Sequence, residues 1–195
     1  MTNSRVRAFF KEAEILEAMN HKNIVKFYSF HETDQYLLIK MELIRGGTLK
    51  RLIEQRKSSR QPFKEEEVAV IMRKLFEGIR YLHNLNIIHR DLKIGKYCSY
   101  KIENILLADD DDLSSIKIVD FGLSAKLEIN ANKNIKAQCG TLLYMAPEMF
   151  NKPSYTKSVD IWSCAVIMYM MFNLGSHPFY LPGMKTEDFK FKLKV

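Results

Sequence analysis

The sequence predicts a mixed α+β fold in which long amphipathic helices accompany short strands. Two segments, 4–19 and 65–83, repeat apolar residues at helical spacing. Several short apolar runs lie between polar turns and have the length of strands. The chain has 195 residues, of which 47% are hydrophobic and 27% charged, so it can bury a real core. This composition excludes a disordered or fibrous protein.

The first part of the chain supplies a helix, a pair of strands and a second helix. Residues 4–19 form the first amphipathic helix. Strands follow at 24–30 and 36–43, and the polar turn 31–34 joins them. The second helix covers 65–83, and its acidic first turn suits the positive end of the helix dipole.

The second part begins with short apolar pieces at 87–88, 105–107 and 116–119. The acidic run 109–112 is expected to be a solvated turn. Beyond Glu148 the sequence predicts helix through Phe172. Its most apolar stretch, 161–172, is too short to cross a bilayer and is expected to be a buried helix.

Charge and cysteine content limit the function classes. Cys98, Cys139 and Cys164 are an odd number without a C-x-x-C pair, which argues against a disulfide scaffold or a zinc site and fits a reducing compartment. The first twenty residues lack the apolar core of a signal peptide. The net charge is +7, but its lysines and arginines are scattered, which disfavours a nucleic-acid binder. We expect a cytoplasmic monomer that binds neither nucleic acid nor membrane.

Three short motifs occur in order: His89-Arg90-Asp91-Leu92-Lys93, Asp120-Phe121-Gly122 and Ala146-Pro147-Glu148. Apolar residues lead into each of the first two. Together the motifs resemble the eukaryotic protein-kinase family. The resemblance implies a two-lobed, protein-kinase-like α+β fold. Residues 1–44 would be the remnant of the small lobe, and residues 45–195 the large lobe without its last helices.

The resemblance also implies a role for each motif residue. Asp91 would be the catalytic base and Lys93 would contact the transferred phosphate; a lysine there is typical of Ser/Thr kinases. Asn104 and Asp120 would be the magnesium ligands, since both offer the hard oxygen atoms that magnesium prefers. The implied cofactors are ATP and Mg²⁺, and the implied partner is a protein substrate.

The nucleotide contacts implied by the resemblance lie elsewhere. Met41 would lie at the back of the adenine pocket, and the backbone from Glu42 to Ile44 would be the hinge that binds the base. Leu106 would also contact the nucleotide. Glu12 matches the helix glutamate that pairs with the nucleotide-binding lysine.

The chain departs from the family at its start. Eleven residues precede Glu12, and they contain neither that lysine nor a Gly-rich loop. Glu14 is an alternative helix glutamate, but Glu12 shares a face with apolar residues and is expected to point inward. Without its cation, Glu12 should turn to solvent or find another partner. A small lobe with two strands is expected to be loose.

A second departure lies in the catalytic loop. Asp91 and Asn104 are thirteen residues apart, whereas family members have five. Removal of eight residues, such as Ile94 to Lys101, restores the family spacing. One hypothesis is that these residues are a short in-frame intron retained in the gene model, which transcript sequencing would test. The alternative is a genuine loop insertion that bulges into solvent.

The third departure concerns regulation and the end of the chain. The arginine that pairs with Glu148 in the family is missing, so Glu148 is expected to lack its partner. Between Gly122 and Gly140 the only hydroxyl is on Ser124, and Ala137 stands where many relatives carry a phosphorylated threonine. We therefore predict no activating phosphorylation in this segment, and no partner for Arg90.

The leading functional prediction is a Ser/Thr protein kinase that transfers the γ-phosphate of Mg-ATP to a protein hydroxyl. The segment 160–163, with Ala165 after it, looks closest to the calcium/calmodulin-dependent group. The main alternative is a catalytically inactive, kinase-like interaction domain. A basic RNA-binding module is a more distant third.

Overall fold

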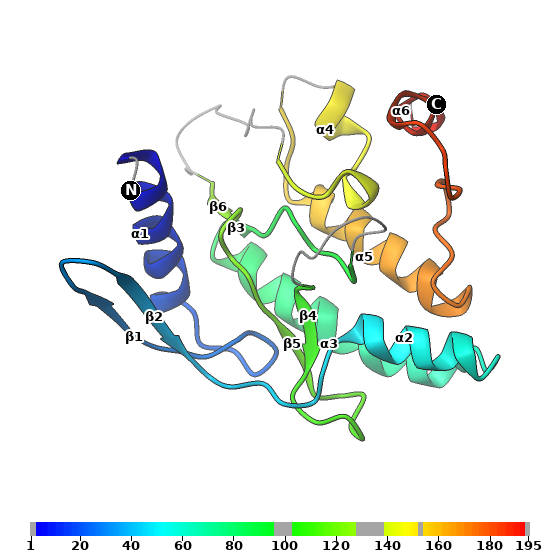
Figure 1. The fold of residues 1–195 in the computed structure, drawn as a ribbon, viewed down its shortest axis with the longest axis horizontal. Coiled ribbons are helices and arrows are strands. Elements are labelled where there is room, and N and C mark those ends of the chain that lie inside the picture. Colours follow the sequence, from blue (N-terminus) through cyan, green and yellow to red (C-terminus); the bar gives the residue numbers. More distant parts are fainter. Residues whose placement is uncertain (1–2, 96–102, 128–138, 152–153, 194–195) are drawn as a thin grey trace.

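The computed structural model describes residues 3–95, 103–127, 139–151 and 154–193. Its elements form a small part and a larger, mostly helical part, as Figure 1 shows. The small part contains α1 (Asn3–Glu17), β1 (Phe27–Glu32) and β2 (Leu37–Met41). The helices of the larger part are α2 (Leu49–Ser58), α3 (Glu65–Asn84), α4 (Glu148–Asn151), α5 (Ser158–Phe172) and α6 (Thr186–Lys192).

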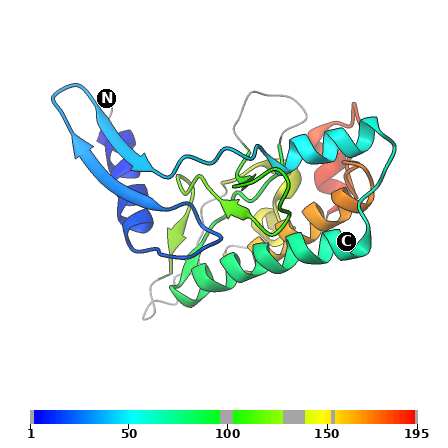
Figure 2. The ribbon, with the colours of Figure 1, turned by 90° about the horizontal axis from the view of Figure 1, so that it is seen from below.

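Helix α1 confirms the first predicted helix and lies along the hairpin of β1 and β2 (Figure 2). Its apolar face buries Ala13, Ile15 and Leu16. The ring of Phe10 lies 5.2 Å from that of Phe30 on β1, a tilted contact typical of aromatic pairs. This packing places the inner face of α1, with Glu12, toward the larger part.

The bounds of the strands and the turn in the hairpin differ from the prediction. β1 begins at Phe27 rather than at residue 24 and continues through Glu32, so the turn is Thr33–Tyr36, closed by a 2.9 Å bond from the amide of Thr33 to the carbonyl of Tyr36. Ile24 and Val25, the predicted start of this strand, pair with Ile118 instead. The amide of Val25 donates to the carbonyl of Ile118 over 2.9 Å, which links the small part to the larger one.

Helix α2 was not predicted from the sequence. The hydroxyl of Thr48 caps it by accepting a 3.1 Å bond from the amide of Arg51. Of its ten residues, Leu49 and Ile53 are buried. A helix with so narrow an apolar face gives a weak periodic signal.

Helix α3 confirms the second predicted helix and forms the floor of the core. It packs against α5 and β5. Its buried residues are Val68, Ile71, Met72, Leu75, Gly78, Ile79 and Leu82. The acidic first turn is at the predicted place.

Two short antiparallel ribbons hold the central loops. β3 (Ile87–Ile88) pairs with β6 (Ala125–Lys126), and β4 (Ile105–Leu107) pairs with β5 (Ile116–Ile118). β3, β4 and β5 match the three predicted apolar pieces, whereas β6 was not predicted. Residues 109–112 form the expected exposed turn between β4 and β5. Asp91 follows β3, Asn104 precedes β4 and Asp120 follows β5, so the ribbons bring the three residues to one region.

The predicted continuous helix from 148 to 172 is wrong. The chain forms two helices, α4 and α5, and the buried residue Tyr155 lies between them. Helix α5 is also not buried on every side, since Ile161 and Tyr169 are 44% and 43% exposed. None of the described helices combines the length and apolar character needed to cross a membrane.

The cysteines of the described part are free thiols. Cys164 is buried in α5, and burial raises the pKa of its thiol. Cys139 is half-buried. Cys98 lies outside the described residues.

Candidate active site

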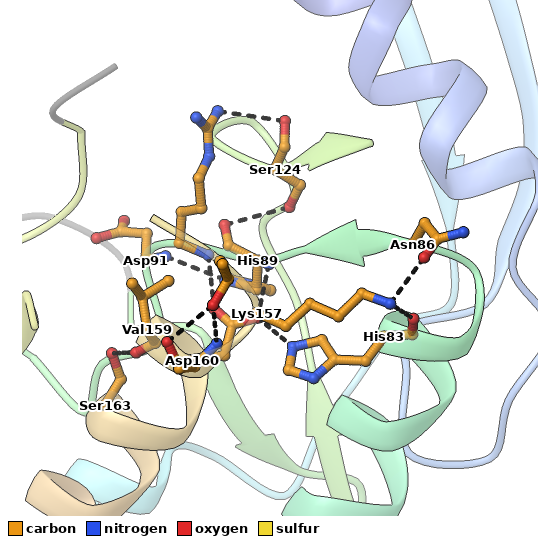
Figure 3. Close-up of polar contacts among 12 residues, drawn as sticks. His83, Asn86, His89, Asp91, Ser124, Lys157, Val159, Asp160 and Ser163 are labelled. Carbon is orange, nitrogen blue, oxygen red and sulfur yellow. Dashed lines mark hydrogen bonds and ion pairs between the residues drawn. The ribbon is translucent and has the colours of Figure 1, made fainter. Parts of the chain in front are cut away.

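A buried carboxylate, Asp160, organises the loop that carries Asp91. Its two oxygens accept from the backbone amides of His89 at 3.0 Å and Arg90 at 2.9 Å, and from Nε2 of His83 at 2.8 Å. Figure 3 shows Asp160 with His83 and His89 gathered around it. Arg90 has a φ of +70°, a left-handed conformation that costs a non-glycine residue energy and persists only where neighbours impose it. Sequence reasoning did not give Asp160 this role; its signal was an acidic residue opening an apolar helix.

His89 packs in the core. Its Nε2 lies 3.2 Å from the carbonyl of Val119 and its ring meets Phe121 edge-on, with centroids 5.0 Å apart. Burial lowers the pKa of His89, so its ring is neutral. A neutral ring that donates from Nε2 leaves Nδ1 to accept the amide of Asp91 at 3.4 Å.

The carboxylate of Asp91 is held on both oxygens. Oδ1 accepts a 2.7 Å bond from the hydroxyl of Thr141, and Oδ2 pairs with the ammonium of Lys93. Asp91 and Lys93 are 7% and 3% exposed. Charge-assisted bonds in such surroundings fix the direction of a carboxylate. Lys93, expected at the transferred phosphate, lies against the predicted base here.

Asn104 joins this group despite the long catalytic loop. Its Oδ1 accepts the amide of Lys93 at 2.8 Å, and its Nδ2 donates to the backbone carbonyl of Asp91. Its own carbonyl accepts the amide of Val119 at 3.0 Å, one residue before Asp120. The thirteen-residue spacing therefore leaves the ends of the loop together. Most of the extra residues, 96–102, lie outside the described part.

Helix α1 meets the Asp120 motif through Glu12. Asp120 is exposed and has a φ of +64°, whereas Phe121 beside it is buried. A Cβ placed on Gly122 would lie 3.3 Å from Oε2 of Glu12 and 3.5 Å from Oδ1 of Asp120. Burial raises the pKa of Glu12, and so does the charge of Asp120, while a hydrogen bond from the Phe121 amide opposes them. Glu12 thus lies against this motif, on the inward side that the sequence predicted. Glu14 is exposed.

The two predicted magnesium ligands fit that ion chemically. Asp120 offers an exposed carboxylate, and Asn104 offers an amide oxygen that retains one lone pair beyond its bond to Lys93. Within the described ranges, no group of three or more His, Cys, Asp or Glu side chains could hold a metal. Magnesium bound here would therefore take its other oxygens from water and phosphate.

The residues predicted to contact the nucleotide lie along one path. Met41 ends β2 and is 42% exposed, while Ile44 and Leu106 are half-buried. The carboxylate of Glu42 forms a 2.6 Å ion pair with Lys117 of β5, the strand residue that pairs with Leu106. This ion pair ties the predicted hinge to the strand that leads to the Asp120 motif. The sequence placed Lys117 on a strand, because it alternates with buried residues, but it did not indicate the ion pair with Glu42.

The expectation that Arg90 has no partner is wrong, and Glu148, expected to lack its arginine, bonds to a neutral group. Arg90 donates from Nε to the carbonyl of Leu123 at 2.6 Å and from Nη1 to the hydroxyl of Tyr155 at 3.3 Å. Glu148 accepts a 3.1 Å bond from the hydroxyl of Ser158. In both cases a neutral group takes the place of the charged one, because a polar side chain that leaves water must be satisfied locally.

Comparison with known proteins agrees with this geometry. The model of the protein kinase domain matches residues 1–193. The chain belongs to the protein kinase domain family. Its two-part α+β architecture is that of a partial kinase fold, with the boundary at residues 44 and 45 still a prediction.

Three curated relatives of this kinase domain are protein kinases. A serine/threonine-protein kinase 33 from Bos taurus is 35% identical over 183 residues, which cover 91% of this chain and 35% of that protein. A calcium-dependent protein kinase 5 from Plasmodium berghei is 40% identical over 184 residues, 94% of this chain and 30% of that protein. A probable myosin light chain kinase from Dictyostelium discoideum is 38% identical over 170 residues, 87% of this chain and 32% of that protein. The chain therefore spans about a third of the length of these relatives.

Proposed function

We propose that this chain is the catalytic part of a Ser/Thr protein kinase, which transfers the γ-phosphoryl group of Mg-ATP to a protein hydroxyl. The observation that carries the proposal is the arrangement of Asp91, which Thr141, Lys93 and Asn104 together hold. The base carboxylate is thus paired with the Lys93 ammonium, and the side chain of the predicted oxygen ligand, Asn104, bonds to the backbone of both residues. The relatives named as serine/threonine and calcium-dependent kinases support the same conclusion.

The mechanism assigns one task to each side chain. Asp91 takes the proton of the substrate hydroxyl. The hydroxyl oxygen then bonds to the γ-phosphorus while the bond between that phosphorus and the leaving ADP breaks. Bound Mg-ATP supplies the phosphoryl group, and its metal neutralises the charge of the phosphates. Thr141 orients the Asp91 carboxylate through the 2.7 Å bond to Oδ1. Lys93 neutralises Asp91 at rest and offers its ammonium to the charge that develops during transfer.

The test is transfer of label from γ-labelled Mg-ATP to peptides whose acceptor is serine, threonine or tyrosine. We expect labelled serine and threonine peptides, and a drop of about 10²- to 10⁴-fold for Asp91→Asn, the usual contribution of a general base. The matched control is Asp112→Asn, which changes an exposed carboxylate of the 109–112 turn and should leave the rate unchanged. Equal rates for Asp91→Asn and the unaltered protein would refute the proposed base.

One observation favours the alternative, a kinase-like interaction domain without activity. Among the described residues, Glu12 lies beside Gly122 and the charge of Asp120, and no cation pairs with it. Thermal unfolding with and without Mg-ATP separates the two functions. A rise in the unfolding temperature supports nucleotide binding, whereas no shift together with no label transfer favours the interaction domain.

The setting of this activity is also proposed. The odd number of cysteines without metal-ligand spacing supports a reducing, cytoplasmic location. We propose a monomer with a protein substrate, which sedimentation of the purified chain would test.

A further inference from the structure

Arg90 is held by neutral groups. Its guanidinium donates to the carbonyl of Leu123 at 2.6 Å, to the hydroxyl of Tyr155 at 3.3 Å and to the carbonyl of Ser124 at 3.5 Å. A guanidinium is a rigid fork suited to phosphate or carboxylate. Among the residues that the structure describes, no ion pair to Arg90 replaces these contacts.

The neighbouring segment cannot supply a phosphate for Arg90. From Ala125 to Cys139 the sequence contains no serine, threonine or tyrosine. The hydroxyl that precedes this segment, on Ser124, is 4% exposed and donates to the carbonyl of His89 at 3.4 Å. A phosphate on Ser124 would have to enter a buried space and would break this bond, and the partners that the structure describes for Arg90 are neutral.

Tyr155 lies between Arg90 of the catalytic loop and the segment 139–141, whose Thr141 bonds to Asp91. Its side chain is buried, and its hydroxyl lies 4.0 Å from the sulfur of Cys139 as well as beside Arg90. Gly140, which follows Cys139, lies so close to the Arg90 backbone that a Cβ on Gly140 would lie 2.5 Å from the carbonyl oxygen of Arg90. After Gly140 comes Thr141, which bonds to Asp91.

We propose that Tyr155 is a positioning residue whose hydroxyl does for Arg90 what a phosphate would otherwise do. The hydroxyl fixes the guanidinium, the fixed Arg90 supports residues 139–141, and Thr141 in turn orients Asp91. The active arrangement is therefore independent of phosphorylation in the segment 125–139. This inference rests on the proposed function, because it concerns the regulation of the same site.

The first test measures order without requiring catalysis. Amide hydrogen exchange is followed in residues 123–127 and 139–145 of the full chain, for the unaltered protein, Tyr155→Phe and the control Tyr169→Phe, which changes an exposed tyrosine of α5. We expect about tenfold faster exchange for Tyr155→Phe, the change that 1.4 kcal/mol produces, and no change for Tyr169→Phe. Exchange that is equal in all three proteins overturns the proposal. The result does not depend on phosphoryl transfer, so failure of the proposed function stays distinguishable.

A second comparison separates positioning from a purely structural role. If the hydroxyl acts through the guanidinium, Tyr155→Phe has no further effect on exchange in the Arg90→Met background. Additive effects of the two substitutions overturn the proposal. Phosphatase treatment gives an independent arm: exchange and label transfer should be unchanged, and faster exchange after treatment would show that a phosphate holds the segment.

Discussion

The catalytic loop allows a quantitative test of how much its extra residues matter. Deletion of Gly95–Ile102 joins Ile94 to Glu103 and shortens the spacing between Asp91 and Asn104 from thirteen residues to five. The product has the same sequence as deletion of Ile94–Lys101. Among the residues that the structure describes, the contacts that close the loop include the bond from the Lys93 amide to Asn104 and the 3.3 Å pair of Lys50 with Glu103, and all four residues are retained.

The deletion should therefore change the free energy of unfolding through the entropy of loop closure alone. For a loop shortened in this ratio, the free energy of unfolding should rise by about 0.8 kcal/mol. For a domain of this size that corresponds to about 2–3 °C in the unfolding temperature. Urea unfolding followed by circular dichroism measures the change.

A matched control keeps the length and removes the sequence. Replacement of the eight residues by eight glycines and serines should leave the free energy of unfolding within about 0.5 kcal/mol of the unaltered protein. A deletion that destabilises the protein by more than 1 kcal/mol would refute the reasoning, because it would show that the extra residues make native contacts that the loop needs.

Three further predictions follow from single contacts. Lys117→Met leaves the carboxylate of Glu42, which is 20% exposed, without its cation, so urea unfolding should show a loss of about 1–3 kcal/mol; the exposed Lys40→Met is the control, and equal losses would contradict the ion pair. Asp160→Asn replaces an acceptor by a donor facing backbone amides and should cost about 2–4 kcal/mol in the same assay, so a change below 0.5 kcal/mol would contradict its role. Burial lowers the pKa of His177, and the unfolded chain takes up its proton below about pH 6.5, so the free energy of unfolding should fall as pH falls through that range. His177→Gln should flatten this fall, and an unchanged slope would count against the buried neutral ring.

The fold was predictable from sequence where a long periodic pattern existed. α1 and α3 appeared near their predicted bounds because each repeats apolar residues over several turns. α2 was missed because Leu49 and Ile53 are its only buried residues. The start of β1 was misplaced because Ile24 and Val25 are as apolar as a strand but meet β5, and an apolar pattern does not name the partner that covers it.

The site divides in the same way. Asp91, Asn104 and Asp120 could be located because their motifs are local in sequence. The groups around them, such as Thr141 beside Asp91 and Tyr155 beside Arg90, come from distant segments and carry no local signature. Such contacts depend on how loops approach one another, so periodicity and spacing cannot reveal them.

The left-handed backbone at Arg90 and Asp120 has a consequence for how this molecule can change. Glycine would adopt both conformations without strain, whereas each larger side chain costs about 1 kcal/mol or more. A glycine at either place would thus relieve the main chain while discarding the guanidinium or the carboxylate. At Arg90 the bonds of the guanidinium offset this relief, whereas the exposed Asp120 is the position at which a screen for heat resistance alone should select glycine.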